Sequence, residues 1–160
     1  MKILIPLILA LLTSGLSADR KASSAQPKVS GTVIMLSNMR TKPRQFVRAD
    51  DEAVVAKQAL PKEHVMRVYY KNGIRSDFAR YIATGKIIIN FDETKQIDYD
   101  VFADKYNVDF TKEINSISKV AVFSVDPSDD VLEKVNEIAA DQSETIQYIQ
   151  PEWIAKVKFR

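Results

Sequence analysis

Few residues of the 160-residue chain have the types and spacing that catalysis requires. The chain has one histidine, His64, and no cysteine, so a metal site or a nucleophile–base pair has no obvious partners. Two acidic pairs, Asp98 with Asp100 and Asp129 with Asp130, could supply a general acid and a general base. Both pairs lie where helices are expected to begin, and helix capping explains them better. We therefore expect a non-enzymatic protein that binds no metal and no cofactor.

The start of the chain is typical of a secretory signal peptide. Lys2 precedes a continuous apolar run over residues 3–12, which is followed by small residues. The run is too short to span a bilayer stably. We expect cleavage after Ala18, with Ala22 or Ala25 as alternatives. The sequence thus predicts a secreted or periplasmic protein, and without cysteine it has neither a lipoprotein anchor nor disulfides.

Charge is distributed unevenly along the rest of the chain. Residues 19–82 carry 13 Lys and Arg against 6 Asp and Glu, a balance of +7. Residues 83–160 carry 9 against 15, a balance of −6. This asymmetry indicates either two modules or two faces that attract each other.

The clearest structural pattern is the apolar strand expected over residues 86–91, directly behind Gly85. Hydrophobic periodicity and turn residues then predict a helix, two strands, a helix and a strand. Their expected bounds are 98–106, 110–114, 120–125, a helix starting at 126–128, and 146–149. This order predicts an α+β fold of the ferredoxin-like, split βαβ type. Such a fold has a four-stranded antiparallel sheet with both helices on one face and the strands at 86–91 and 120–125 in the centre.

One face of this predicted sheet is left without helices. Residues of a strand alternate between its two faces, so Ile88, Val120 and Val122 lie on the uncovered face among polar neighbours. A partly apolar open face is a candidate docking surface. The alternative is that the N-terminal half folds back and covers it.

The N-terminal region has weaker patterns and is expected to form a small α/β region. Strands are expected over residues 29–36 and 64–71, and a short helix from Asp50 or Asp51 to about residue 60. Asn72-Gly73 is a strong hairpin signal. The expected division of the chain is a signal peptide at 1–18, a disordered leader at 19–28, a basic region at 29–82 and a second domain at 83–160.

A basic loop is expected over residues 37–48. Its charged residues are Arg40, Lys42, Arg44 and Arg48. Clusters of this kind bind nucleic acid in many proteins, but export makes that partner a poor choice. An anionic envelope surface or the acidic C-terminal half is a better partner, and a solvated loop is the simplest alternative.

The order and spacing of several short motifs resemble the propeptides of subtilisin-like serine proteases, a family that includes free-standing protease inhibitors. The resemblance covers about residues 81–158. The matching segments are Tyr81-Ile82, GKIIINF at 85–91, FADKYNV at 102–108, VAVFSV at 120–125 and IQYIQPEW at 146–153. No single motif is specific.

The resemblance implies a mode of binding. Propeptides of this family dock an open sheet face on two surface helices of the protease, and carboxylates after the last strand cap the N-termini of those helices. Glu152 matches one such position, whereas Gln150 and Pro151 replace residues that are acidic in some members.

The resemblance also implies that the C-terminal tail lies in the substrate cleft of the protease as an added strand. This tail would consist of Ile154, Ala155, Lys156, Val157, Lys158, Phe159 and Arg160. Any of the last three could enter the specificity pocket, and a solvated basic tail is the alternative. The resulting hypothesis is an exported inhibitor or chaperone of a subtilisin-like protease. The other hypothesis is an envelope binding or assembly protein that keeps the fold without inhibiting.

Overall fold

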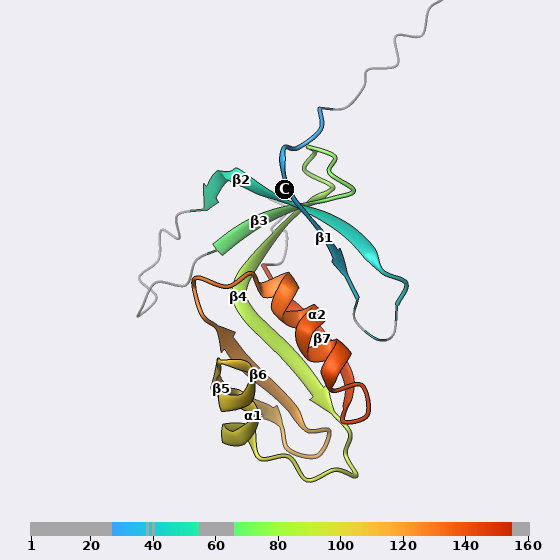
Figure 1. The fold of residues 1–160 in the computed structure, drawn as a ribbon, viewed down its shortest axis with the longest axis vertical. Coiled ribbons are helices and arrows are strands. Elements are labelled where there is room, and N and C mark those ends of the chain that lie inside the picture. The colour runs from blue at the N-terminus through green and yellow to red at the C-terminus, as the bar shows by residue number, and fades with distance from the viewer. Residues whose placement is uncertain (1–26, 38, 40, 55–65, 155–160) are drawn as a thin grey trace, which may run out of the picture.

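The computed structural model describes residues 27–37, 39, 41–54 and 66–154 of the chain (Figure 1). The described part contains seven strands and two helices. They are β1 (Gly31–Leu36), β2 (Arg44–Val54), β3 (Met66–Lys71), β4 (Arg80–Phe91), α1 (Tyr99–Tyr106), β5 (Val108–Asn115), β6 (Val120–Val125), α2 (Val131–Asp141) and β7 (Ile146–Trp153). The expected α+β class is confirmed. Within these residues no helix is long and apolar enough to cross a membrane.

The long strand β4 organises the sheet. Ala83 pairs with Arg67 of β3 on one edge and with Trp153 of β7 on the other. Further along the strand, Ile88 pairs with Val122 of β6 and with Gln150 of β7. Strand β7 therefore follows one edge of β4, while β3 and β6 occupy the other edge one after the other.

Gly85 marks the change of partner along β4. It has a φ of 80°, a conformation that residues with a side chain rarely adopt. It lies between the residues that pair with β3 and those that pair with β6. The glycine thus gives β4 the local irregularity at which one strand partner ends and the next begins.

Within the described residues one sheet has seven strands, where the sequence predicted a four-stranded sheet in the C-terminal half and two further strands in a separate region. The continuous order is β1-β2-β3-β4-β6-β5, and β7 pairs with β4. All of the pairings are antiparallel. The strand predicted at 120–125 matches β6, and the other strands of the C-terminal half are longer than predicted. The sheet is larger because β1, β2 and β3 join it through the first residues of β4.

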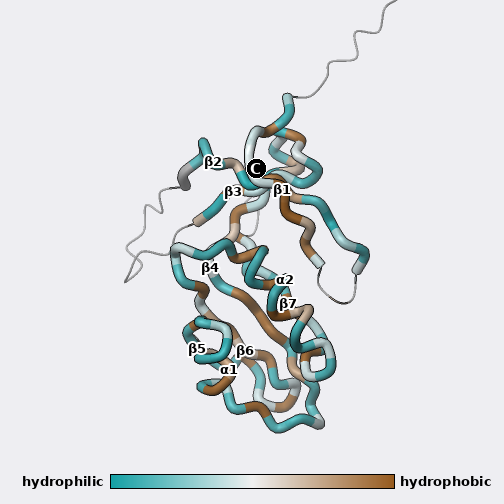
Figure 2. The backbone as a smooth tube through the Cα atoms, viewed as in Figure 1, coloured by the Kyte–Doolittle hydropathy of each residue, from teal (hydrophilic) through white to brown (hydrophobic). Residues whose placement is uncertain are grey.

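The main core lies between the sheet and the two helices. Ile87, Ile89 and Phe91 of β4 share one face and are fully buried. They pack in one cluster with Phe102 of α1 and Leu132 of α2. Burying a side chain of this size stabilises a fold by about 1.5–3 kcal/mol. Figure 2 shows the hydrophobic character of β4 where it passes behind α2.

Helix α1 begins after Asp98, as predicted, whereas α2 was expected to start at 126–128 and begins later, at Val131 after Asp130. Asp98 accepts hydrogen bonds from the backbone N–H groups of Asp100 and Val101, both at 3.1 Å. Asp130 does the same for Leu132 at 2.9 Å and for Glu133 at 3.4 Å. The capping interpretation of these two carboxylates is confirmed.

The end of β1 contacts α2. Asn136 of α2 donates to the carbonyl of Met35 at 2.7 Å and accepts from the N–H of Ser37 at 2.9 Å. Ile34 and Leu36 of β1 belong to the same core cluster as α2. In the described part of the chain, β1 therefore lies beside α2 and not over the open sheet face (Figure 1).

Two predictions for this region are wrong. Residues 44–48 were expected to lie in a basic loop, and a helix was expected from Asp50 or Asp51, but residues 44–54 form β2. Residues 50–52 are three consecutive acidic residues, which the sequence indicated as a helix start. In the structure their carboxylates bind arginine side chains and a tyrosine hydroxyl instead. Asp51 accepts from Arg75 at 2.7 Å, and Glu52 accepts from Tyr70 at 2.8 Å. The rest of the predicted helix, to residue 60, lies outside the described residues.

The hairpin signal forms the predicted tight turn. Asn72 and Gly73 have φ values of 56° and 66°, and the N–H of Ile74 donates to the carbonyl of Lys71 at 3.3 Å. Positive φ at both central residues is what a type I′ turn requires. The next strand, β4, begins only at Arg80, so the turn opens a longer connection.

Candidate functional site

The three residues predicted to form a docking face come together on adjacent strands. Ile88 of β4 pairs with Val122 of β6, and Asn90 pairs with Val120. Ile88 and Val120 are half-buried, and Val122 is only 2% exposed. The apolar surface that this face offers to a partner therefore comes from Ile88 and Val120, because Val122 is almost fully buried.

Polar side chains surround these apolar residues. Thr111 of β5 and Ser124 of β6 share a hydrogen bond between their hydroxyls at 3.0 Å. On the other side, the Tyr148 hydroxyl donates to Oε1 of Gln150 at 2.7 Å. Asn90 has a buried Oδ1 atom with no hydrogen-bond partner among the described residues. The face is thus an apolar centre with a polar margin, a composition typical of protein-binding surfaces.

Glu152 lies near the end of β7 and is bound within the chain. Its Oε2 atom accepts a hydrogen bond from the Thr84 hydroxyl at 2.6 Å. A carboxylate has about four acceptor sites, so this bond leaves the group able to accept from a partner as well.

The predicted tail begins beside β4. The N–H of Ile154 donates to the carbonyl of Ile82 at 2.9 Å, and the Ile154 side chain is 38% exposed. The remaining predicted tail residues, 155–160, lie outside the described residues. The chain is therefore held to the sheet as far as Ile154.

The acidic pair at the start of α2 contains the most densely bonded carboxylate of the described chain. Asp130 is 5% exposed. Besides capping α2, it accepts from Nη1 of Arg48 at 2.9 Å and from the hydroxyl of Tyr69 at 3.1 Å. Nη1 of Arg67 lies 3.9 Å away. These hydrogen bonds compensate the buried negative charge of Asp130, because a buried charge without partners is strongly destabilising.

Electrostatics at this cluster follow from burial and from the carboxylates. Burial first, and then the charge of Asp130, raises the pKa of Tyr69, so its hydroxyl stays a donor. Hydrogen bonds to Asp50 and Asp130 raise the pKa of Arg48. Both raised pKa values favour the protonated forms, in which Tyr69 and Arg48 donate hydrogen bonds to Asp130. The cluster therefore connects β2 and β3 to the start of α2 through charged and hydroxyl groups.

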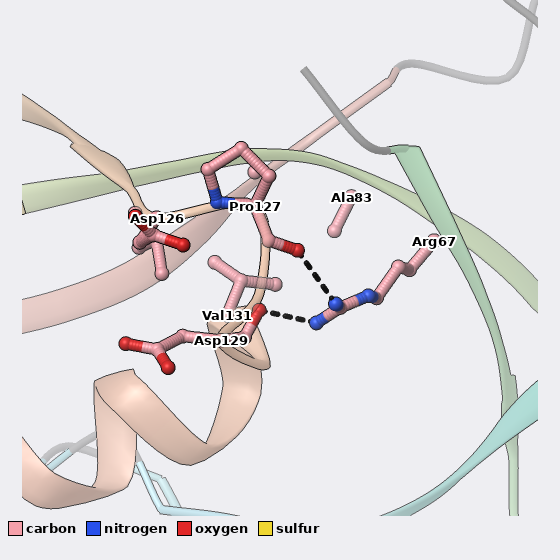
Figure 3. A pocket seen from close by; sticks show the side chains of 8 residues that line it. Arg67, Ala83, Asp126, Pro127, Asp129 and Val131 are labelled. Carbon is pink, nitrogen blue, oxygen red and sulfur yellow. Dashed lines mark hydrogen bonds between the residues drawn. The ribbon is translucent and has the colours of Figure 1, made fainter. Parts of the chain in front are cut away.

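Arg67 completes the attachment of β3 to α2 by binding backbone carbonyls. Its Nη2 atom donates to the carbonyl of Pro127 at 2.9 Å, and its Nη1 atom donates to the carbonyl of Asp129 (Figure 3). Sequence reasoning missed the roles of Arg67 and Tyr69. The charge asymmetry between the two halves was the available signal, because both Arg48 and Arg67 come from the basic half.

The predicted basic loop does not form one cluster. Arg48 belongs to β2 and is bound by Asp130 and Asp50. Arg44 opens β2 and is exposed, as is Lys42, while Arg40 lies outside the described residues. The suggested pairing of the basic residues with the acidic C-terminal half is confirmed for Arg48.

Metal binding has no candidate in the part of the chain that the structure describes, where no three His, Cys, Asp or Glu residues are grouped suitably. His64 lies outside that part.

Comparison with family models, with curated proteins and with solved structures finds no match for this chain.

Proposed function

We propose that the protein is an exported inhibitor or chaperone of a subtilisin-like serine protease and that it docks by its open sheet face. The observation that carries the proposal is the contrast between the two faces of β4. Ile87 and Ile89 are fully buried in the core shared with the helices, while Ile88 between them is only half-buried, as is Val120. An apolar patch with polar neighbours on an otherwise well-packed sheet suits a protein partner.

We further propose that β4 to β7 with α1 and α2 form a ferredoxin-like, split βαβ unit. Three antiparallel pairings support it, because they give the order β7-β4-β6-β5. Both helices share one core with the same face of β4. In this proposal β1, β2 and β3 are an addition to the unit, attached through the first residues of β4.

The tail mechanism rests on the resemblance of the sequence to protease propeptides. In this proposal Glu152 binds at the N-terminus of a protease helix, and residues 154–160 occupy the substrate cleft. The bond from Ile154 to Ile82 supports a tail that starts in an extended direction alongside β4.

The test is a progress curve of a purified subtilisin-type protease with increasing amounts of the protein. The face variant Ile88→Glu with Val120→Glu should weaken inhibition at least tenfold, since two charges would be desolvated against the protease. The control Val101→Glu changes a residue that is 64% exposed on α1 and should leave inhibition unchanged. Removal of residues 154–160 should also weaken inhibition while the fold persists.

Equal inhibition by the face variant and the wild type would exclude docking by this face. Equal inhibition by the truncated protein would exclude the tail mechanism alone. Digestion of the wild type without inhibition of any subtilisin-type protease would exclude the inhibitor function.

A second candidate is a non-inhibitory envelope binding or assembly protein. The observation that favours it is the attachment of the N-terminal strands, because β3 pairs with β4 and the Arg48–Asp130 contact connects β2 to α2. Limited proteolysis distinguishes the two candidates. A separable N-terminal half favours the inhibitor, and a resistant chain favours the binding protein.

A further inference from the structure

A pocket of about 70 Å³ lies at the sheet edge formed by β7. Thr41, between β1 and β2, contributes to the lining, as do residues of β1, β2 and β4. A single water needs roughly 10–15 Å³ on such a measure. The pocket therefore has room for a side chain, and its lining determines which kind.

Three aromatic rings contact one another in the pocket lining. The rings of Phe46 and Trp153 are stacked with centroids 5.7 Å apart. Tyr81 meets Phe46 at 5.4 Å and Trp153 at 5.4 Å, both in edge arrangements. Because the rings support each other, they form a pre-organised apolar wall that loses little entropy when a ligand packs on it.

The polar groups of the lining include several donors that are not used within the described chain. Arg44 is the arginine of the described residues that has neither an ion pair nor a side-chain hydrogen bond with another of them. The Oε1 atom of Gln150 accepts from Tyr148, which leaves the amide N–H groups of Gln150 as donors. The indole N–H of Trp153 makes no hydrogen bond to a described residue. Donors of this kind beside one guanidinium favour a ligand that carries acceptors and one negative charge.

We propose that this pocket binds the free C-terminal residue of a peptide. Its apolar side chain packs on Phe46 and Trp153, and its carboxylate accepts hydrogen bonds from Arg44. A C-terminal residue carries an apolar group and a carboxylate on the same Cα atom, so a pocket the size of one residue can bind both. An Asp or Glu side chain would need a second residue to supply the apolar group. This inference is independent of protease inhibition.

Intrinsic fluorescence can test the proposal, because Trp153 is the single tryptophan of the chain. The full chain is titrated with N-acetyl-Gly-Gly-Leu as the free acid, with its C-terminal amide, and with N-acetyl-Glu-Leu-amide. We expect a saturable change in fluorescence with the free acid and at least about tenfold weaker binding of both amides, as loss of a hydrogen bond to a charged group predicts.

Two matched variants locate the carboxylate. Arg44→Gln should weaken binding of the free acid about tenfold or more. Its fold should be unchanged, because the backbone pairing of Arg44 with Leu36 is kept and the Arg44 side chain makes no ion pair or hydrogen bond with a described residue. Lys42→Gln, two residues before Arg44 and outside the lining, should bind as the wild type does. Equal binding of the free acid and its amide, equal binding by Arg44→Gln and the wild type, preference for the Glu side chain, or no saturable change would each overturn the proposal.

Discussion

Nη1 of Arg48 donates a hydrogen bond to Oδ2 of Asp130 at 2.9 Å, although the two residues are 82 positions apart in the chain. The contact joins a strand of the basic half to the capping residue of a helix in the acidic half. The Asp130 carboxylate is almost fully buried, so water screens its attraction to Arg48 far less than it would at a surface ion pair. The opposite charges of the two halves thus contribute to the fold itself, because they attract each other across it.

Replacing Asp130 by Asn should lower the free energy of unfolding by about 1–3 kcal/mol, because Arg48 and Tyr69 lose a charged acceptor while the helix cap is kept. Urea denaturation monitored by circular dichroism measures it. Asp129→Asn is the matched control, since the Asp129 side chain is 40% exposed and lies 3.5 Å from Lys134. The control should change stability by about 0.5 kcal/mol or less.

A double-mutant cycle can isolate the contact itself. Arg48→Gln, Asp130→Asn and the combined variant should show a coupling energy of about 0.5–3 kcal/mol, as expected for residues in direct contact. Strictly additive losses of stability would mean that the direct Arg48–Asp130 contact contributes no free energy of its own.

The neighbours Ile88 and Ile89 should respond very differently to truncation. Ile89→Ala leaves a cavity beneath the helices and should cost about 2–5 kcal/mol of stability. Ile88→Ala removes a half-buried side chain from the open face and should cost less than about 1.5 kcal/mol. Thermal or chemical denaturation of both variants measures the difference. Similar costs would mean that the open face is covered in solution.

Replacing Gly31 by Ala should detach β1. A Cβ atom at this position would lie 1.8 Å from the carbonyl oxygen of Arg48, so the strands cannot keep their spacing. We expect a loss of about 1–3 kcal/mol and faster hydrogen exchange in residues 31–36. Val33→Ala is the control, because Val33 is 58% exposed on the same strand. Unchanged exchange in the glycine variant would show that β1 tolerates a shift.

Asp141 should stay ionised in acid. The hydrogen bond from Lys105, whose Nζ lies 2.7 Å away, and then that from Tyr106 lower the pKa of Asp141 from 3.8 to about 2. A lowered pKa in the folded state means that the ionised group stabilises the fold above about pH 4 and that this contribution is lost as the pH falls toward 2. Carboxyl NMR titration should show the low pKa.

The matched variant checks the sign of this dependence. Asp141→Asn should be less stable than the wild type near neutral pH, and the two proteins should converge as the pH approaches 2. The difference should also shrink at high salt, because the pair is exposed. A difference that persists in acid would point to a role other than charge.

The elements of the C-terminal half were predictable because their signals are local. The strand at 120–125 and the two capping aspartates depend on neighbours within a few residues. Periodicity and capping report directly on such neighbours. The same signals placed Ile88 and Val120 on one face.

The attachment of the N-terminal strands was not predictable in the same way. Residues 44–54 form a strand whose acidic residues bind Arg75 and Tyr70, and a local interpretation assigned three consecutive acids to a helix start. The pairing of Val68 with Ile82 and the approach of Arg67 to α2 depend on the tertiary fold. Hydrophobic patterning specifies which face is buried but not which strand becomes the neighbour.

The stacking of Phe46 on Trp153 has a consequence for the order of events during synthesis. The chain emerges from the ribosome with its N-terminus first, so β1 and β2 are complete long before their partners α2 and β7 exist. A nascent chain that ends before Trp153 leaves Phe46 and the inner side of β1 without their packing partners, in a state open to aggregation or to chaperones. The packing of Phe46, although that residue is made early, can be completed only after β7 has been made.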